Sequence, residues 1–124
     1  MTASDDIDLD ELTGDDLARV LAALANPHRL RILAVLARGS VHVSQLARDV
    51  KLSRPLVHVH LQRLEAAGLV TGRLELSEEG RALKLFEIRP FALRLTPEAI
   101  ARAALTLTTP GGDRPPREKK EEPK

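Results

Sequence analysis

The chain has 124 residues, of which 43% are hydrophobic, which suits one compact domain and is too little for two. It has no cysteine, tryptophan or tyrosine, which excludes disulfide bonds, thiolate metal sites and an aromatic platform for stacking single-stranded bases. The net charge of +1 is unevenly distributed: residues 1–16 carry seven acids and no bases, whereas residues 17–109 carry fourteen bases and seven acids, a balance typical of phosphate-binding surfaces.

The sequence predicts two helices in succession at the start of the domain. Thr13 and Asp16 form a Thr-x-x-Asp pattern that resembles a weak capping box before a stripe of leucine and valine. Asn26 is predicted to cap the second helix, with Pro27 in its first turn and Gly39 at its end.

A short third helix is expected over residues 45–50, with Ser44 as its cap. After a brief link, Ser53 can cap a fourth helix, Pro55 suits its first turn, and Gly68 supplies a left-handed stop. Helix, short turn and helix follow one another as in a helix-turn-helix.

The fourth helix is predicted to have one apolar and one polar side. Val57, Leu61 and Leu64 recur at i, i+4 and i+7 and are expected to face the core. The opposite side carries polar residues that can hydrogen-bond to base edges, as expected of a DNA recognition helix: Arg54, His58, Gln62 and Glu65.

The remaining chain predicts a hairpin and one more helix. Residues 69–76 are strand-like, 77–80 are turn-like, and alternation resumes up to Ile88, which together indicate a β-hairpin, or wing. Thr96 and Pro97 open a last helix. Residues 1–12 are interpreted as a flexible acidic arm, 13–109 as the folded domain, and 110–124 as a disordered, charged tail.

Three segments carry a family resemblance in their order and spacing. They are residues 24–33 (LANPHRLRIL), 43–47 (VSQLA) and 53–70 (SRPLVHVHLQRLEAAGLV). Together they resemble the ArsR/SmtB-type winged-helix repressors over roughly residues 17–107. The expected fold class is therefore mainly α (α+β): a winged helix-turn-helix with five helices and a β-hairpin wing. The resemblance also implies a homodimer, joined through the first and last helices, that binds a pseudo-palindromic operator and represses transcription.

The resemblance places the base-reading positions at the start of the fourth helix. Arg54 can pair bidentately with guanine, which is worth about 1–3 kcal/mol of discrimination. Ser44, Gln45 and Arg63 are expected to contact phosphates. For each of these polar side chains the plainer interpretation is a solvated surface residue. The complete predicted DNA-binding set is Ser44, Gln45, Ser53, Arg54, Pro55, His58, Val59, Gln62, Arg63, Arg73, Arg81 and Lys84.

Apolar side chains on the first and last helices exceed what a small core and a wing can cover. A second copy of the chain is expected to cover them, in a dimer with two-fold symmetry. The predicted interface consists of Leu17, Val20, Leu21, Leu24, Ile100, Ala103, Ala104 and Leu107.

Known sensing chemistry of the resembled family does not transfer to this chain. His42 and Ser44 stand where metal-sensing relatives have a Cys-x-Cys pair. The last helix has no His or Asp, and Glu98 is its only possible metal ligand. His58 and His60 lie about 200° apart around a helix and cannot close on one ion. No metal site or cofactor is therefore expected and the effector stays unassigned, while His60 is expected to be a core histidine hydrogen-bonded to backbone.

Enzyme activity is not expected, because no catalytic residues form a recognisable nucleophile, phosphate-loop or metalloprotease pattern. The start of the chain lacks a signal-peptide pattern, and no apolar run approaches the ~20 residues of a membrane span, so a cytoplasmic protein with no membrane partner is expected. The expected function is sequence-specific regulation of transcription through double-stranded DNA. Two alternatives stay open: a non-specific architectural DNA-binding protein, and a winged-helix protein-interaction module.

Overall fold

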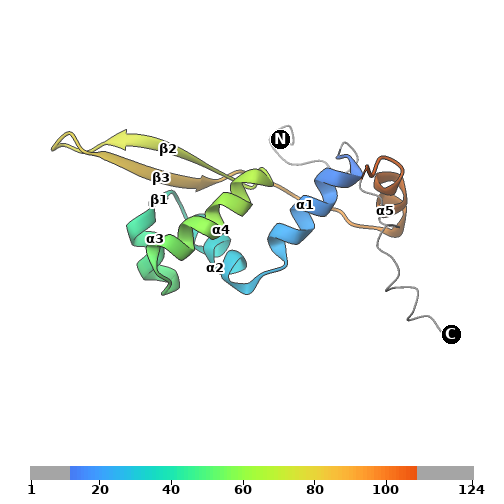
Figure 1. Cartoon of the computed structure of the whole chain (residues 1–124), viewed down its shortest axis with the longest axis horizontal. Helices are drawn as coiled ribbons and strands as arrows, with labels where there is room; N and C mark the ends of the chain where they lie inside the picture. Colours follow the sequence, from blue (N-terminus) through green and yellow to red (C-terminus); the bar gives the residue numbers. More distant parts are fainter. Residues whose placement is uncertain (1–11, 109–124) are drawn as a thin grey trace.

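The computed structural model describes residues 12–108, so residues 1–11 of the predicted arm and the whole predicted tail lie outside the described residues. The described part contains five helices and three strands (Figure 1). In chain order these are α1 (Gly14–Leu24), α2 (Pro27–Leu36), β1 (Val41–His42), α3 (Val43–Val50), α4 (Arg54–Ala66), β2 (Val70–Leu76), β3 (Ala82–Ile88) and α5 (Pro97–Ala104). The predicted fold class, five helices with a hairpin wing, is confirmed.

The side chains predicted to begin the helices do so, with one exception. The side-chain oxygen of Asn26 accepts hydrogen bonds from the backbone N–H groups of His28 (2.9 Å) and Arg29 (3.1 Å). Thr13, Ser53 and Thr96 cap α1, α4 and α5 in the same way. These local patterns are readable because a cap depends only on residues within one turn of it.

The exception is α3, where the prediction that Ser44 caps the helix is wrong. The helix starts at Val43, and its N-cap residue, His42, forms no side-chain cap hydrogen bond. His42 also ends β1, a two-residue strand that the sequence did not predict and that pairs with β3 opposite Leu85. Because the chain passes directly from this strand into α3, Ser44 lies inside the first turn.

The three strands form an antiparallel sheet in the order β1-β3-β2. Its base covers the core, in which α2, α3 and α4 contribute side chains at most 1% exposed, such as Ile32, Leu46 and Leu61. Phe86 of β3 closes the core from the sheet side at 3% exposure. This arrangement leaves the outer side of α4 and the distal part of the hairpin uncovered.

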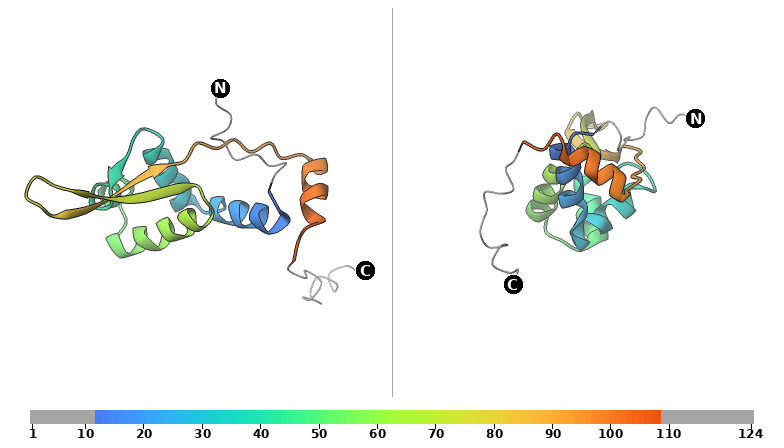
Figure 2. Two further views of the ribbon diagram at one scale, coloured as in Figure 1. Left: turned by 90° about the horizontal axis from the view of Figure 1, so that it is seen from above. Right: turned by 90° about the vertical axis from the view of Figure 1, so that its right-hand side faces the viewer.

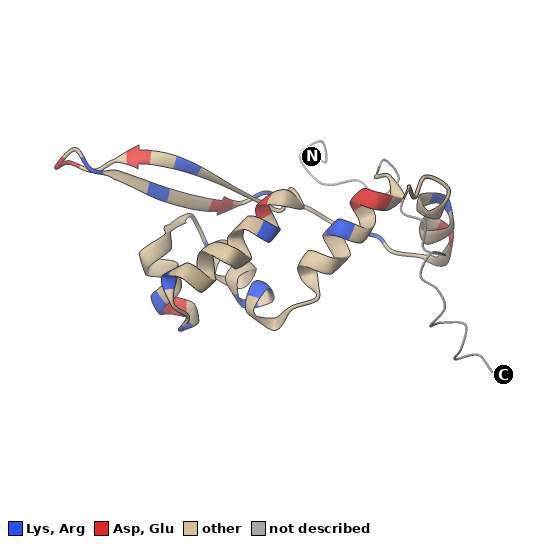
Figure 3. Ribbon diagram, viewed as in Figure 1, with Lys and Arg blue, Asp and Glu red and all other residues tan. Residues whose placement is uncertain are grey.

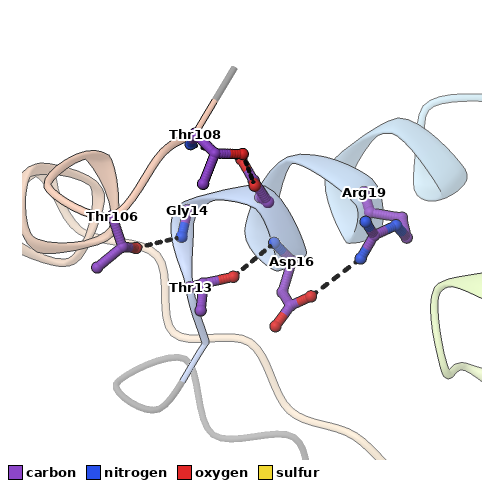
Figure 4. A network of polar contacts seen from close by, with 7 residues as sticks. Thr13, Gly14, Asp16, Arg19, Thr106 and Thr108 are labelled. Atoms are coloured by element: carbon purple, nitrogen blue, oxygen red, sulfur yellow. Dashed lines mark hydrogen bonds and ion pairs between the residues drawn. The ribbon is translucent and has the colours of Figure 1, made fainter. Parts of the chain in front are cut away.

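The molecule is long, with the hairpin at one end and the α1 and α5 helices at the other (Figures 1 and 2). An extended connector leads from β3 to α5, which packs against α1. At this contact the Gly14 N–H donates to the Thr106 hydroxyl (2.8 Å), and Thr108 donates to the Asp15 carboxylate (Figure 4). A Cβ on Gly14 would lie 2.3 Å from the Ala103 carbonyl oxygen, so a glycine is required there.

The contact between α1 and α5 corrects part of the predicted dimer surface. Leu17, Val20 and Ala103 were expected to be exposed on the single chain, but each is at most 5% exposed there. Leu17 and Ala103 are buried because α5 packs onto α1 within the same chain, whereas Val20 belongs to the main core. Other members of the predicted set stay on the surface, among them Leu21, Ile100 and Leu107, which are 36%, 48% and 47% exposed.

Candidate nucleic-acid interface

The turn between α3 and α4 fixes the direction in which α4 leaves the core. Lys51 adopts a left-handed conformation (φ 62°), and the Leu52 N–H donates to the Ala47 carbonyl (3.1 Å), which ends α3. The Ser53 hydroxyl then accepts from the Leu56 N–H (3.3 Å) and starts α4. Two helices joined by this short turn form a helix-turn-helix.

The two sides of α4 differ as predicted. Val57, Leu61 and Leu64 are at most 1% exposed and belong to the core. Arg54, His58 and Gln62 are exposed on the outer side. Within the described part of the chain, these three side chains have no hydrogen-bond or ion-pair partner, so their donors are available to a ligand. Ser53, Pro55, Val59 and Arg63 are exposed as well.

An open hollow joins the start of α4 to α3 and the wing. The predicted DNA-binding residues Ser44, Arg54, Pro55, His58 and Lys84 line it, together with His42, Val43, Ala82 and Leu83. The fold therefore brings together residues that are up to 42 positions apart in the sequence, from His42 to Lys84. A hydroxyl, a guanidinium, an imidazole and an ammonium group at one hollow can all donate to phosphate or base acceptors.

Gln45 is less available than the residues of this hollow. Its amide nitrogen donates to the Asp49 carboxylate (2.8 Å), and its amide oxygen accepts from Arg48 (2.7 Å). Both contacts stay on the surface of α3, so Gln45 would have to exchange them to contact a phosphate.

The wing is not a basic surface. Residues 70–88 hold three basic and four acidic side chains, a net charge of −1, and Figure 3 shows the two signs alternating along the hairpin. Arg73 pairs with the carboxylates of Glu87 (3.0 Å) and Glu75 (3.5 Å). Hydrogen bonds from Arg73 and Ser40 lower the pKa of the Glu87 carboxyl. The charge of Arg73 is therefore balanced within the protein.

The register of the hairpin separates Arg73 from Lys84. Directly opposite residues share a face of the hairpin. Leu74 and Lys84 lie on the same face as Phe86, whereas Arg73 and Leu85 lie on the other face. Leu74 and Leu76 are 67% and 76% exposed on the Lys84 face. The sequence analysis did not select these leucines, although the strand alternation places both on the Lys84 face once the register is known.

Gly72 leaves space that two neighbouring side chains of the wing occupy. A Cβ at this position would lie 2.7 Å from the Phe86 ring and 2.8 Å from Cε of Lys84. The Lys84 ammonium lies 5.7 Å from the centre of the Phe86 ring, within reach of a cation–π contact. The absence of a side chain at Gly72 thus leaves room for Lys84 to lie against the Phe86 ring.

His60 is buried on the inner side of α4, as predicted, but its partner is different. The expected bond to backbone is wrong, because the ring nitrogen Nδ1 lies 3.2 Å from a guanidinium nitrogen of Arg29. Burial and the nearby positive charges of Arg29 and Arg63 lower the pKa of His60. The neutral ring is therefore the favoured form.

Residues 12–108 contain no group of three His, Asp or Glu side chains arranged to hold a metal ion. No helix in this range is both long and apolar enough to cross a membrane. The prediction that the protein needs no metal stays a prediction.

Comparison with known proteins gives consistent matches. The family model "Bacterial regulatory protein, arsR family" matches residues 26–71, which contain α2, α3 and α4. An HTH-type transcriptional regulator of Methanocaldococcus jannaschii is 36% identical over 87 residues, covering 70% of this chain and 90% of that protein. The HTH-type transcriptional regulator CmtR of Mycobacterium tuberculosis is 42% identical over 65 residues, covering 52% of this chain and 55% of CmtR.

Solved structures share the fold as well. A homodimeric winged helix-turn-helix DNA-binding domain from Mycobacterium bovis is 34% identical, with a TM-score of 0.55 over 73% of this chain and 74% of that chain. NolR from Sinorhizobium fredii is 26% identical, with a TM-score of 0.53 over 73% of this chain and 80% of that one.

Proposed function

This chain belongs to the arsR family of bacterial regulatory proteins, and from that premise we propose that it is a homodimeric repressor that reads a specific operator with α4. The chain is a transcriptional regulator with a helix-turn-helix DNA-binding domain. Operator specificity, the dimer and the repressing sign are the parts that we propose. We assign DNA binding and dimerisation to residues 13–109.

The observation that carries specificity is the outer side of α4. Arg54, His58 and Gln62 are exposed, differ in hydrogen-bonding chemistry and have no partner among the described residues. A protein that only neutralises phosphates needs positive charge and not this variety. An arginine bidentate to guanine contributes about 1–3 kcal/mol of discrimination against other bases.

The hollow beside α4 supplies the non-specific part of the proposed interface. Ser44 and Lys84 lie next to Arg54 and His58 and can hold the phosphate backbone while α4 enters the major groove. Arg63, also exposed on α4, adds a further charge for a phosphate.

Binding of the purified protein to two labelled duplexes of equal length tests this proposal. One duplex carries the sequence upstream of its own gene and the other a shuffled version, and fluorescence anisotropy is followed at two salt concentrations. A specific reader should prefer the first by about 10³ or more. Equal affinities that fall together with salt would indicate an architectural role instead.

The proposed dimer rests on the apolar surface at the α1 and α5 end. Leu21, Ile100 and Leu107 are all more than one-third exposed there. Two-fold symmetry would place two α4 helices about 34 Å apart, one turn of DNA. Sedimentation equilibrium should give twice the chain mass, and Ile100→Lys should shift the mass toward that of one chain. A wild-type mass of one chain at micromolar concentration would contradict the dimer.

One observation favours a second candidate function. Leu74 and Leu76 are among the most exposed apolar side chains on the wing, whose net charge is −1. Such a wing suits a protein partner better than phosphates. Failure of the protein to bind either duplex would favour this protein-interaction role.

A further inference from the structure

Arg29 connects three helices through one side chain. Its Nε donates to the Ala23 carbonyl of α1 (2.7 Å), and a terminal nitrogen donates to the Ala22 carbonyl (3.3 Å). The other terminal nitrogen contacts Nδ1 of His60 in α4 (3.2 Å). Carbonyls in the last turn of a helix can lack partners within the helix. Arg29 supplies the partner of the Ala23 carbonyl, whereas the Ala22 carbonyl also accepts from the Ala25 N–H (3.3 Å).

The chemistry of this contact fixes the form of the His60 ring. Arginine offers only donors, so Nδ1 must be an unprotonated acceptor, and the ring proton of the neutral form is therefore on Nε2. Nε2 is buried and has no partner among the described residues, and the whole side chain is 7% exposed. A buried unpaired donor is tolerated at a cost, which makes the bond at Nδ1 the one polar contact that holds this ring.

The two ends of this contact lie in helices with different proposed tasks. His60 lies on the inner side of α4, whose outer side carries Arg54 and His58. The carbonyls of Ala22 and Ala23 lie in α1, part of the apolar end that we assign to the dimer. Among the described residues His60 is the one buried polar side chain, and the apolar packing around it is non-directional. The contact with Arg29 can therefore hold the angle between α1 and α4.

We propose that Arg29 is a positioning residue that couples α1 to α4 through His60 and so sets the separation of the two recognition helices in the dimer. This inference rests on the proposed homodimeric operator reader. In that dimer, a change in the angle between α1 and α4 moves both α4 helices relative to each other. Because one base pair turns a half-site by about 34°, the contact would also set the half-site spacing that the protein accepts.

Proton uptake acts on the same contact. The titratable and charged groups that face His60 are Arg29 and His28 from α2 and Arg63 from α4, and none of them is acidic. The rings of His28 and His60 lie 5.5 Å apart. Protonation of His60 would occupy Nδ1 and place a cation beside Arg29, so acid should break the contact. The neutral side chain of His60→Gln keeps an oxygen that can accept from Arg29 and cannot take up this proton.

Pulsed dipolar spectroscopy on the full chain tests the proposal without DNA. The chain has no cysteine, so a single nitroxide at Glu65→Cys, exposed near the end of α4, reports the distance between the two α4 helices. The expected result at neutral pH is a narrow distribution for the labelled parent and for His60→Gln, and a broadened or shifted one for His60→Leu. Leucine suits the buried position, so the fold should survive, which a thermal melt checks.

Arg31→Gln is the matched control, because Arg31 is an exposed arginine on α2 two positions away and its side chain has no hydrogen bond or ion pair with another described residue. It should leave the distribution unchanged. At pH 5.5 the parent should broaden more than His60→Gln. An unchanged distribution in His60→Leu would overturn the positioning role, even if the duplex titration showed operator specificity.

A duplex panel separates this inference from the proposed function. Half-site spacing in the upstream duplex is changed by one base pair in each direction. The parent should prefer the natural spacing by about tenfold or more, whereas His60→Leu should lose most of that preference. Equal loss of affinity at every spacing would overturn the positioning role. No preference of the parent for upstream over shuffled DNA, or a monomeric parent, would overturn the proposed function as well.

Discussion

The outer side of α4 and the wing both carry arginines that the sequence predicts to bind DNA, but the structure gives those arginines different surroundings. Arg54 on α4 is exposed, with no partner in the described part of the chain. Arg73 on β2 is also exposed, yet it contacts two carboxylates, Glu75 and Glu87. A basic residue therefore contributes to binding only the charge and the hydrogen-bond donors that its own protein has not already engaged.

The cause of the difference lies in strand pairing. Glu87 on β3 comes beside Arg73 because the hairpin register places β2 and β3 side by side, and Ser40 adds a hydrogen bond (3.2 Å) to the same carboxylate. On α4, the residue one turn after Arg54 is His58, so no carboxylate lies within one turn along that side. The outer side of α4 therefore keeps unengaged hydrogen-bond donors, whereas on the wing the donors of Arg73 already contact carboxylates.

The largest effect is expected from Arg54→Ala. Loss of a bidentate base contact should weaken binding to the upstream duplex by about 10- to 100-fold and leave binding to a shuffled duplex nearly unchanged. Competition anisotropy with both duplexes measures the ratio. Equal weakening on both duplexes would show that Arg54 contacts a phosphate and would contradict base reading by α4.

Gly72→Ala should damage the wing while sparing α4. The new Cβ would lie 2.7 Å from the buried Phe86 ring, so the ring and Lys84 must move. Overpacking of this kind costs about 1–3 kcal/mol, which exceeds the 0.4–1 kcal/mol that alanine gains over glycine in the unfolded chain. Urea unfolding measures the loss, with Thr71→Ala on the opposite face as control. A stability equal to wild type would show that the wing adapts freely.

Lys84→Ala should have a smaller effect that depends on salt. The ammonium lines the hollow beside Arg54 and has no carboxylate partner among the described residues. Removing one phosphate contact should reduce the slope of log affinity against log salt by about 1 on both duplexes. A slope equal to wild type would place Lys84 outside the interface.

Glu87→Gln should free Arg73 from the nearer of its two carboxylates, leaving only Glu75, and so make the wing more like the outer side of α4. Binding to both duplexes should strengthen at low salt, and adding Arg73→Ala should cancel the gain. In the wild-type protein the contact between Arg73 and Glu87 also predicts a pH dependence of stability. Because Arg73 and Ser40 lower the pKa of Glu87, the contribution of this contact to the stability of the fold is present above pH 4.5 and is lost as the pH falls through the lowered pKa. Carboxyl NMR titration checks this direction, and a Glu87 pKa above 4.5 would contradict the pairing.

Local features were predictable from the sequence, whereas pairings between distant segments were not. Asn26 and Ser53 cap helices through neighbours three residues away or closer, and Gly68 ends its helix region with a positive φ of 80°. The prediction for Ser44 failed because β1 consists of two residues that become a strand only by pairing with β3. Burial of Leu17 depends on α5, which returns from more than 80 positions away.

The candidate site shows the same division. The polar and apolar sides of α4 follow from helical periodicity, and the structure confirms both. The pairing of Arg73 and the contact between Arg29 and His60 depend on strand register and on packing of α2 against α4. Patterns in a single sequence contain neither the register nor this packing. The sequence therefore assigns Arg73 to DNA binding and gives Arg29 no role.

The most direct measurement sets Arg54→Ala against Arg73→Ala on the upstream and shuffled duplexes, at one salt concentration and in one titration series. We expect Arg54→Ala to lose most of the preference for the upstream duplex, and Arg73→Ala to keep wild-type affinity on both within about twofold, as for surface contacts of small energy. Equal losses for the two variants would contradict the account, because they would show that engagement within the protein does not decide which arginine reads DNA.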